Sequence, residues 1–288
     1  MLSQLKKLKP DISELQLSEV KVDTTIIGYL ATIFTENGYP YAGGCSEKRD
    51  TAIRIAAAEC IERAIVHKIR EESDGECLLL NEFPTTCGFA AGFDSAKTKA
   101  RAICEAYERW AWSKWMDENY SIPIVEVANC ITDPLSSYFQ KTFDQVIFLE
   151  KEIQPELNWL HNQESIKLGI VLGIKGNGVF PGSRVVSVTE DPWGHALLEA
   201  WRHAIIFENI SKYSGEAKDI FDKRIMHFGN YKELAFSAIE RSKKSKWPKP
   251  KLRLLQEVQT PMEKTYLWRA LCHDFVGWHE GPIDRFVY

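Results

Sequence analysis

The chain has 288 residues, of which 44% are hydrophobic and 26% are charged, and its formal net charge is −4. This composition is typical of a globular protein that buries a substantial core, and the length allows either one large domain or two smaller ones. The negative charge argues against nucleic acid or an anionic membrane as a partner. No run approaches the roughly 20 apolar residues that a membrane span needs, and no apolar segment follows the lysines of the first ten residues, so we expect a cytoplasmic protein.

The cysteines and histidines predict neither disulfides nor zinc. The cysteines are odd in number and scattered, without a C-x-x-C pair, so we expect them to be reduced and structural. The histidines have no H-E-x-x-H or similar spacing, so we expect no zinc site. The seven cysteines are Cys45, Cys60, Cys77, Cys87, Cys104, Cys130 and Cys272.

The first strand and helix unit is predicted between residues 24 and 75. The run 24–34 is β-branched and apolar, which predicts a strand, and the turn residues 37–40 lead into a second short strand around Tyr41 and Ala42. Ser46 or Asp50 can then cap a helix whose apolar residues recur at helical spacing. We expect this helix to end near Gly75.

Two further units repeat this plan. Residues 85–91 are predicted to be extended, and a helix capped by Asp94 or Ser95 follows toward Trp115, with its end marked by Asn119. The third unit has strands starting at Lys167 and Ser183 and a helix opened by Asp191-Pro192. Residues 211–288 are predicted to be mainly helical. No low-complexity segment or Gly/Ser-rich linker divides the chain, so we expect one domain.

A basic run interrupts this last part at Lys243, Lys244, Lys246, Lys249 and Lys251, with Trp247, Pro248 and Pro250 between the lysines. It predicts either a solvated loop, which we favour, or contact with an anionic partner.

The first two helices carry the same motif, Ala-x-x-Glu-x-x-Glu-Arg. It gives Glu59, Glu62 and Arg63 in the first helix and Glu105, Glu108 and Arg109 in the second. Carboxylates three residues apart share a helical face, so two such helices brought together would gather four carboxylates that repel one another unless cations lie among them. Mg²⁺ with nucleotide phosphates is the commonest pairing for such a site. A single motif is also explained by an exposed pair between Glu and Arg at i and i+4 that binds nothing.

Small residues and tryptophans accompany the acidic motifs. Alanine or cysteine adjoins each motif, which indicates close helix packing and partly enclosed acidic faces, where an unpaired carboxylate is costly. Trp110, Trp112 and Trp115 could form a platform for a ligand, but we predict that they belong to the core. A phosphate-binding loop is excluded, because neither G-x-x-x-x-G-K-[ST] nor a strand-linked G-x-G-x-x-G is present.

Together these segments resemble the YcaO domain family. The resemblance rests on GGCSEKRDTAIRIAAAECIERA, then CGFAAGFDSAKTKARAICEAYERW, then EDPWGHALLEAWRHA, which occur in the family's order over about residues 24–210. It implies an α+β fold: a single YcaO-like domain over residues 1–288, built of repeated strand and helix units, with a mixed sheet packed against helices. It also implies binding of ATP and Mg²⁺ between the acidic helices.

The family's chemistry is ATP-dependent phosphorylation of a peptide amide oxygen, leading to azolines, thioamides or amidines. The resemblance therefore implies a peptide-modifying enzyme of a ribosomal peptide pathway, working with a substrate peptide and a separate leader-binding or accessory protein. A homo-oligomer is an alternative to a monomer. Carried over by position, Glu59, Glu62, Glu105 and Glu108 would bind the metal, and Arg63 and Arg109 would pair with phosphate or orient the carboxylates. Glu199 of the third helix is a weaker candidate, and the resemblance identifies no catalytic residue.

Three positions depart from the family pattern. Lys97 stands where a further carboxylate is common, Phe93 replaces an amide side chain, and Gly44-Cys45-Ser46 replaces Gly-Lys-Gly. The first two make the expected site less negative and less polar. An alternative hypothesis is therefore a YcaO-like protein that has lost catalysis and serves as a scaffold or binding subunit, and a third is that the acidic helices are structural and bind no ligand.

Overall fold

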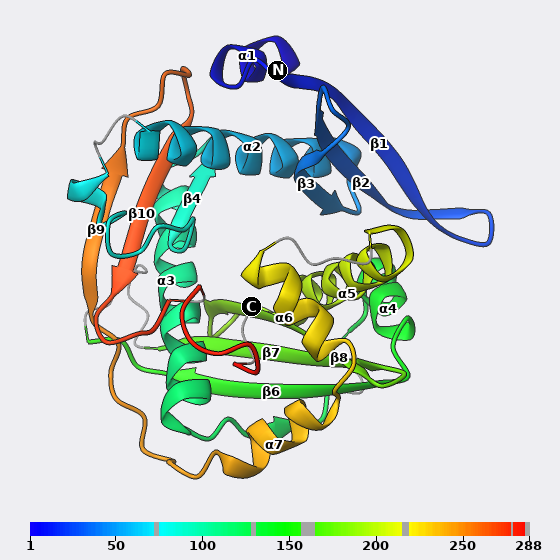
Figure 1. Ribbon diagram of the computed structural model, residues 1–288, viewed down its shortest axis with the longest axis vertical. Helices are drawn as coiled ribbons and strands as arrows, with labels where there is room; N and C mark the ends of the chain where they lie inside the picture. The colour runs from blue at the N-terminus through cyan, green and yellow to red at the C-terminus, as the bar shows by residue number, and fades with distance from the viewer. Residues whose placement is uncertain (72–74, 128–130, 157–164, 215–218, 278, 286–288) are drawn as a thin grey trace. The chain divides into compact units, whose positions relative to one another are not determined.

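The computed structural model describes residues 1–288 except 72–74, 128–130, 157–164, 215–218, 278 and 286–288. It combines helices with antiparallel sheets (Figure 1). The chain divides into two compact units: unit 1 contains residues 1–106 and 252–271, and unit 2 contains residues 107–251 and 272–288.

Unit 1 begins with a short helix, α1 (Leu2–Leu8), and a three-stranded sheet in the order β1-β2-β3. The strands are β1 (Ile12–Val22), β2 (Thr25–Thr35) and β3 (Pro40–Ser46), and both pairs are antiparallel. The predicted strands at 24–34 and around Tyr41 are confirmed. Alternate residues of β2, including Ala31 and Ile33, are buried, as expected for a sheet with one face on the core.

The helix α2 (Arg49–Glu71) covers the inner face of this sheet. Its apolar side consists mainly of alanines, and these pack in one core with Ile12, Ile33 and Phe89. Small residues allow a close approach: a Cβ atom on Gly44 of β3 would lie 2.1 Å from the carbonyl oxygen of Ala52. The backbone of β3 therefore rests on the backbone of α2.

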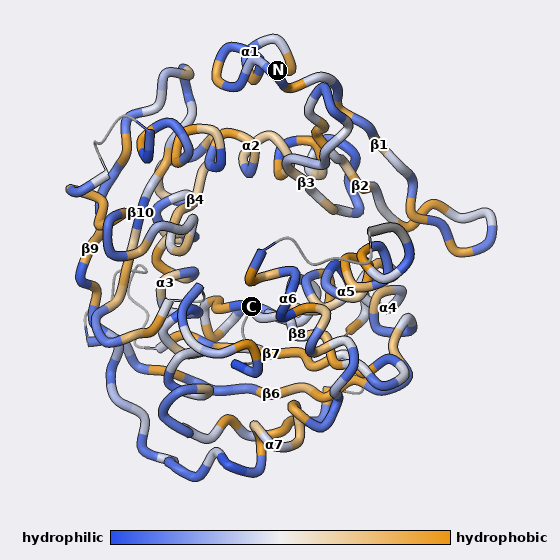
Figure 2. The backbone as a smooth tube through the Cα atoms, viewed as in Figure 1, coloured by the Kyte–Doolittle hydropathy of each residue, from blue (hydrophilic) through white to orange (hydrophobic). Residues whose placement is uncertain are grey.

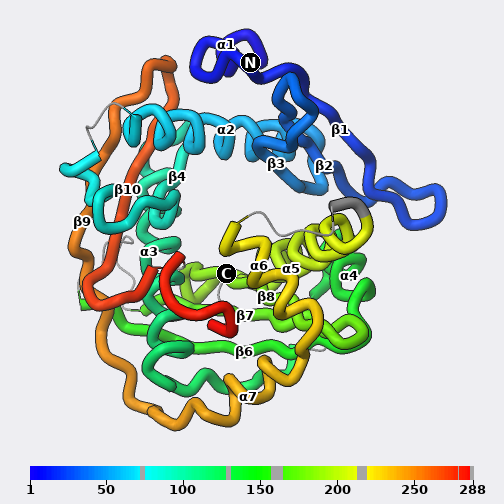
Figure 3. The backbone as a smooth tube through the Cα atoms, viewed as in Figure 1, coloured from blue at the N-terminus to red at the C-terminus, as the bar shows by residue number. Residues whose placement is uncertain are grey.

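A second sheet of unit 1 joins parts of the chain that are far apart in sequence. Its order is β4-β10-β9, formed by β4 (Phe89–Gly92), β10 (Tyr266–Cys272) and β9 (Leu252–Val258). Figure 3 shows cyan β4 beside red-orange β10, and Phe89 pairs with Arg269 in an antiparallel register. A one-turn helix, η1 (Glu76–Leu78), precedes β4. The helix α3 (Ser95–Glu118) follows β4 and runs from unit 1 into unit 2.

Unit 2 is built on a four-stranded antiparallel sheet in the order β5-β6-β7-β8. Its strands are β5 (Ile124–Val125), β6 (Gln145–Ile153), β7 (Ile166–Lys175) and β8 (Gly178–Ser187). The central strand β7 is buried almost throughout, and its hydrophobic colouring in Figure 2 agrees with this. The helix α5 (Trp193–Asn209) packs on β7 and β8, and α4 (Pro134–Lys141) packs on α5. Three antiparallel sheets thus take the place of the single mixed sheet that the sequence predicted.

The last part of the chain is less helical than predicted. A π-helical turn, η2 (Ile210–Ser214), and the helices α6 (Ile220–Phe228) and α7 (Glu233–Arg241) are followed by the strands β9 and β10. The helical prediction is wrong for those two stretches. The stretch LRLLQEV has a single β-branched residue and YLWRALC has none, so the strand signal in the sequence is weak. Pairing with β4 places the second stretch in a sheet.

The segment after β10 is held in unit 2 by an ion pair whose arginine is buried. Arg285 donates to both oxygens of Asp117 at the end of α3, at 2.6 Å each, and Ser113 Oγ donates to the same carboxylate. Arg224 of α6 donates to carbonyl oxygens of residues 280–282. These contacts fix the segment on α3 and α6.

The predicted core tryptophans are confirmed, since Trp110, Trp112 and Trp115 are all buried. None of the described cysteines forms a disulfide, and Cys130 lies outside the described residues. Within the described ranges, no helix combines the length and hydropathy needed to cross a bilayer.

Candidate functional site

The first glutamate of each helical motif anchors its helix to the strand before it. Glu59 accepts a hydrogen bond from the backbone N–H of Gly43 at 3.0 Å, and Glu105 accepts one from that of Gly88 at 3.1 Å. In the third unit Glu199 accepts one from the N–H of Ser183 at 3.0 Å. In each unit, the repeated glutamate thus accepts a hydrogen bond from an amide in the preceding strand or next to it. A buried amide without an acceptor would be costly.

Glycine makes this contact possible in the first and third units. Gly44 follows Gly43, and Gly182 precedes Ser183, and at both a Cβ atom would overlap the helix backbone, with Ala52 O at 2.1 Å and Ala196 O at 2.0 Å. The helix can therefore approach closely enough for its glutamate to reach the strand amide. The arrangement repeats because the sequence pattern repeats.

The second glutamate of α2 differs from the others. Within the described part of the chain, the half-buried Glu62 carboxylate accepts no hydrogen bond and forms no ion pair. Burial, then the negative charges of Glu105 and Glu59, raise the pKa of Glu62 well above its ordinary value. Unit 1 thus brings together three of the four predicted metal-binding glutamates, and Glu62 is the member without a protein donor.

Two arginines flank this group in unit 1. Arg63 forms an ion pair with Glu59 at 2.5 Å and donates to the carbonyl oxygen of Tyr41 at 2.8 Å. Arg101 donates to the carbonyl oxygen of Ala91 at 3.1 Å, and its charge, like that of Arg63, opposes the rise in the pKa of Glu62. Arg101 was not predicted, although its position four residues before Glu105 on the same helix was a signal for it.

Glu108, the fourth predicted glutamate, belongs to unit 2 and is occupied by protein donors. It accepts hydrogen bonds from Ser183 Oγ at 2.9 Å and from the N–H of Val185 at 3.1 Å, and it forms an ion pair with Arg109 at 3.4 Å. Trp112 Nε1 donates to the same Ser183 hydroxyl at 2.7 Å. With only 3% of its surface exposed, Glu108 holds α3 on β8.

Glu199 is also a structural carboxylate. Burial opposes its ionisation, but the charge and hydrogen bond of His195, the charge of Arg109 and the N–H of Ser183 together lower the pKa of Glu199 to about 2. His195 Nε2 lies 3.2 Å from Glu199 Oε1. The weaker role predicted for Glu199 in ligand binding thus has a physical reason, because this carboxylate already has partners.

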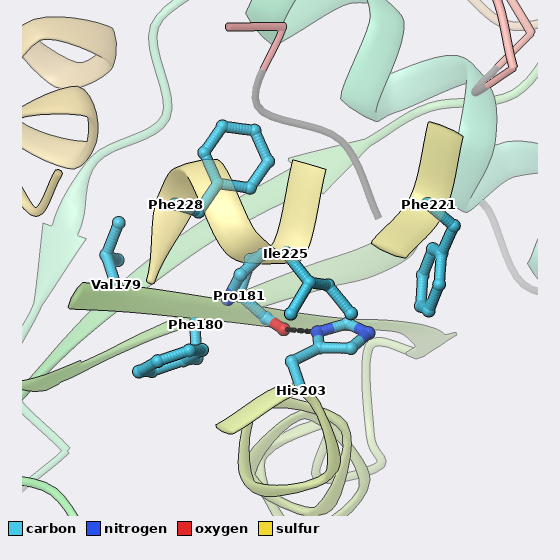
Figure 4. Close-up of a pocket in the computed structure, with 7 residues that line it drawn as sticks. All are labelled: Val179, Phe180, Pro181, His203, Phe221, Ile225 and Phe228. Carbon is cyan, nitrogen blue, oxygen red and sulfur yellow. Dashed lines mark hydrogen bonds between the residues drawn. The ribbon is translucent and has the colours of Figure 1, made fainter. Parts of the chain in front are cut away.

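A small apolar cavity lies between β8, α5 and α6, and His203 lines it (Figure 4). His203 Nδ1 donates to the carbonyl oxygen of Pro181 at 2.6 Å, and Phe221 and Ile225 of α6 lie near the ring. Burial lowers the pKa of His203, although Glu199 and the Pro181 carbonyl act in the opposite direction. This histidine is a core residue that joins three elements.

The three departures from the family pattern lie at strand and helix ends in unit 1. Lys97 and Phe93 are exposed, and Cys45 is buried on β3. The backbone N–H of Lys97 donates to Asp94 Oδ1 at 2.9 Å, so Asp94 is the predicted helix cap.

Across the described ranges, no three His, Cys, Asp or Glu side chains stand ready to hold a metal ion. The chemistry of Glu59, Glu62 and Glu105 nevertheless fits a hard divalent cation. Carboxylate oxygens are the ligands that Mg²⁺ uses, and the raised pKa of Glu62 marks a negative charge that a cation would stabilise.

By sequence, no protein-family model matches the chain, and no curated protein does. Solved structures do match its fold. A chain of the E. coli microcin synthetase McbBCD complex matches with a TM-score of 0.62 and 11% identity, covering 90% of this chain and 86% of that one. The YcaO protein of Methanopyrus kandleri, bound with AMPPCP and Mg²⁺, matches with a TM-score of 0.56 and 15% identity, covering 93% and 86%.

The chain has a YcaO-like fold. A heterocyclase solved with substrate and cofactor also matches, with a TM-score of 0.58 and 11% identity. That match includes 98% of this chain but only 53% of the heterocyclase chain. The YcaO-like fold predicted from the order of the three motifs is therefore confirmed, and at these identities the likeness concerns the fold.

Proposed function

We propose that this protein uses ATP and Mg²⁺ to activate a backbone amide of a peptide. The proposal rests above all on Glu62, a half-buried carboxylate with a raised pKa, no protein donor, and two further carboxylates beside it. Support comes from the YcaO protein with the same fold that was solved with AMPPCP and Mg²⁺.

In this proposal, Glu62 would coordinate Mg²⁺, and Glu59 and Glu105 would supply further negative charge. Mg²⁺ would neutralise phosphate charge when bound. Arg63 and Arg101 would bind phosphate oxygens, because a planar guanidinium group can donate two hydrogen bonds to a phosphate. Glu108 and Arg109, which the family pattern also suggested, would instead position α3, because the Glu108 oxygens already bind Ser183 and Val185.

The reaction would replace a poor leaving group with a good one. The amide oxygen would attack the γ-phosphorus of ATP, ADP would leave, and the amide nitrogen would lose its proton. A nucleophile would then add to the same carbon and give up its own proton, and the carbon–oxygen bond would break so that the oxygen leaves as part of inorganic phosphate. A Cys, Ser or Thr side chain of the peptide would give an azoline, and an external sulfur or nitrogen nucleophile would give a thioamide or an amidine.

A separate protein would deliver the peptide. One structure of the same fold is the McbBCD complex with pro-MccB17 bound, at a TM-score of 0.62 and 10% identity. We therefore propose a substrate peptide and an accessory protein as partners of this chain.

The test combines a binding and an activity measurement. We expect Mg·ATP to raise the melting temperature of the wild type, because a ligand of the folded state stabilises it, and we expect peptide-dependent ADP release when the accessory protein is present. Glu62→Gln should abolish both, whereas Glu47→Gln, an exposed position just before α2, should change neither. The proposal is refuted if the wild type neither binds Mg·ATP nor releases ADP.

A second candidate is a binding subunit without catalysis. It is favoured by the absence of a ready metal site among the described residues and by exposed Lys97 at the start of α3. If peptide modification in a reconstituted pathway requires this protein but is unaltered by Glu62→Gln, this second function is the correct one.

A further inference from the structure

An exposed row of lysines lies between α7 and β9 in unit 2. Lys243, Lys246 and Lys249 are all exposed and are spaced three residues apart. Within the described residues none of them forms an ion pair. Two other lysines of this segment have partners, since Lys244 lies over the ring of Tyr120 and Lys251 is 3.6 Å from Glu156.

The backbone under this row is fixed at both ends. The N–H groups of Lys243 and Lys244 donate to the carbonyl oxygen of Asn119, and the Lys244 carbonyl accepts from the N–H of Ser121 at 2.8 Å. At the other end, the carbonyl oxygens of Pro250 and Lys251 accept from the N–H groups of Glu156 and His273. The segment therefore has a defined path although it contains little regular secondary structure.

Trp247 anchors the middle of the segment. Its ring lies 5.9 Å from that of Trp110 and 5.5 Å from that of Tyr120, measured between centroids, and its Nε1 donates to the carbonyl oxygen of Ser121 at 2.9 Å. The neighbouring Lys246 and Lys249 are exposed. The contacts of Trp247 therefore hold the backbone in place while these two side chains remain accessible.

The backbone that carries the three lysines does not run straight. The chain bends at Lys246, and the prolines at 248 and 250 favour extended backbone only for themselves and for the residues just before them. The three lysines therefore place three separate positive charges on one short, anchored segment. A flexible acidic polypeptide can bring a carboxylate to each of them.

We propose that Lys243, Lys246 and Lys249 form a docking surface for an acidic segment of a partner polypeptide. Nucleic acid is a poorer fit. Single strands bind aromatic side chains on which bases can stack, but Trp247 is committed to Trp110 and Tyr120. The proposal does not depend on the function proposed above, because it concerns binding alone.

The experiment uses fluorescein-labelled deca-glutamate as the probe and measures anisotropy with the full chain at low salt. We expect binding that weakens as salt rises toward about 0.15 M, because exposed charges are screened. The variant K243E/K246E/K249E should bind about tenfold more weakly or worse, as the loss of three surface contacts implies. The neutral variant K243Q/K246Q/K249Q should show a smaller loss in the same direction, and it serves if the charge reversal prevents folding.

The matched control reverses three exposed lysines of unit 1 in K6E/K7E/K48E, which changes the net charge equally. It should retain affinity within about threefold. An equal loss in this control, no binding by the wild type at low salt, or tighter binding of labelled deca-thymidylate than of deca-glutamate would each overturn the proposal.

Discussion

Glu59 accepts the backbone N–H of Gly43 through one carboxylate oxygen, at 3.0 Å, while its other oxygen pairs with Arg63 at 2.5 Å. The helix α2 is thereby joined to β3 by a bond whose acceptor and donor are 16 residues apart. The same kind of bond recurs at Glu105 and Glu199.

This bond predicts different effects for two substitutions at position 59. Glu59→Ala should reduce the free energy of unfolding by about 2 kcal/mol, because the amide of Gly43 loses its acceptor. Glu59→Gln should cost less than about 1 kcal/mol, since the amide oxygen can still accept and only an exposed ion pair is lost. Urea unfolding measures both, with Glu47→Ala as an exposed control, and equal losses for Ala and Gln would contradict the role of this hydrogen bond.

Glu62 should make stability depend on pH in an unusual direction. Because its pKa is raised in the folded protein, the folded state holds this proton above pH 4.5 more firmly than the unfolded state does. Protonated Glu62 therefore contributes to the free energy of unfolding below pH 4.5, and this contribution is lost as the pH rises through the pKa of Glu62 in the folded state. Glu62→Gln should melt above the wild type at pH 8 without Mg²⁺ and lose this advantage near pH 4.5. A wild type that remains the more stable protein at pH 8 would count against the raised pKa.

His203 should make the protein sensitive to acid. Its pKa is lowered in the folded state, so the unfolded chain binds the proton more readily, and stability present above about pH 6.5 is lost as the pH falls. His203→Gln should cost about 1 kcal/mol at pH 7.5 through the altered hydrogen bond to Pro181 and should flatten the loss between pH 7 and 5. An unchanged acid profile in this variant would show that another group is responsible.

The Asp117–Arg285 pair should be a large contributor to the stability of unit 2. Asp117→Asn should reduce the free energy of unfolding by about 3 kcal/mol, because a buried guanidinium loses its counter-charge. Arg285→Lys should also be destabilising, since lysine cannot donate to both oxygens in a fork. Calorimetry can compare both with Lys9→Gln, which removes an exposed pair to Asp11 and should cost about 0.5 kcal/mol.

The sequence predicted the parts of the fold that depend on neighbouring residues. The strand β2, the helices α2, α3 and α5, and the capping role of Asp94 follow from local periodicity and turn chemistry. The sheet of β4, β10 and β9 could not be predicted, because the Phe89–Arg269 pair joins residues 180 positions apart and no local pattern specifies such a partner.

The sequence predicted which glutamates would form the candidate site, but it did not predict that they have different roles. The motif gave the same weight to Glu59, Glu62, Glu105 and Glu108, since both of its glutamate positions lie on one helical face. Their difference depends on which strand amide or hydroxyl each one reaches, as with Ser183 and Glu108. The recurring interval of 16 or 17 residues between each anchoring glutamate and its amide donor was the signal available in the sequence.

The close approach at Gly44 and Gly182 also bears on how far such a sequence can diverge. Because main chain rests directly on main chain there, the separation between helix and strand is independent of the size of the surrounding apolar side chains. Core residues can then exchange volume with one another, which cores tolerate when the total is kept, while the acidic helices stay at the same height above their strands. This is a physical reason why a chain at 11–15% identity to the solved structures can retain their architecture.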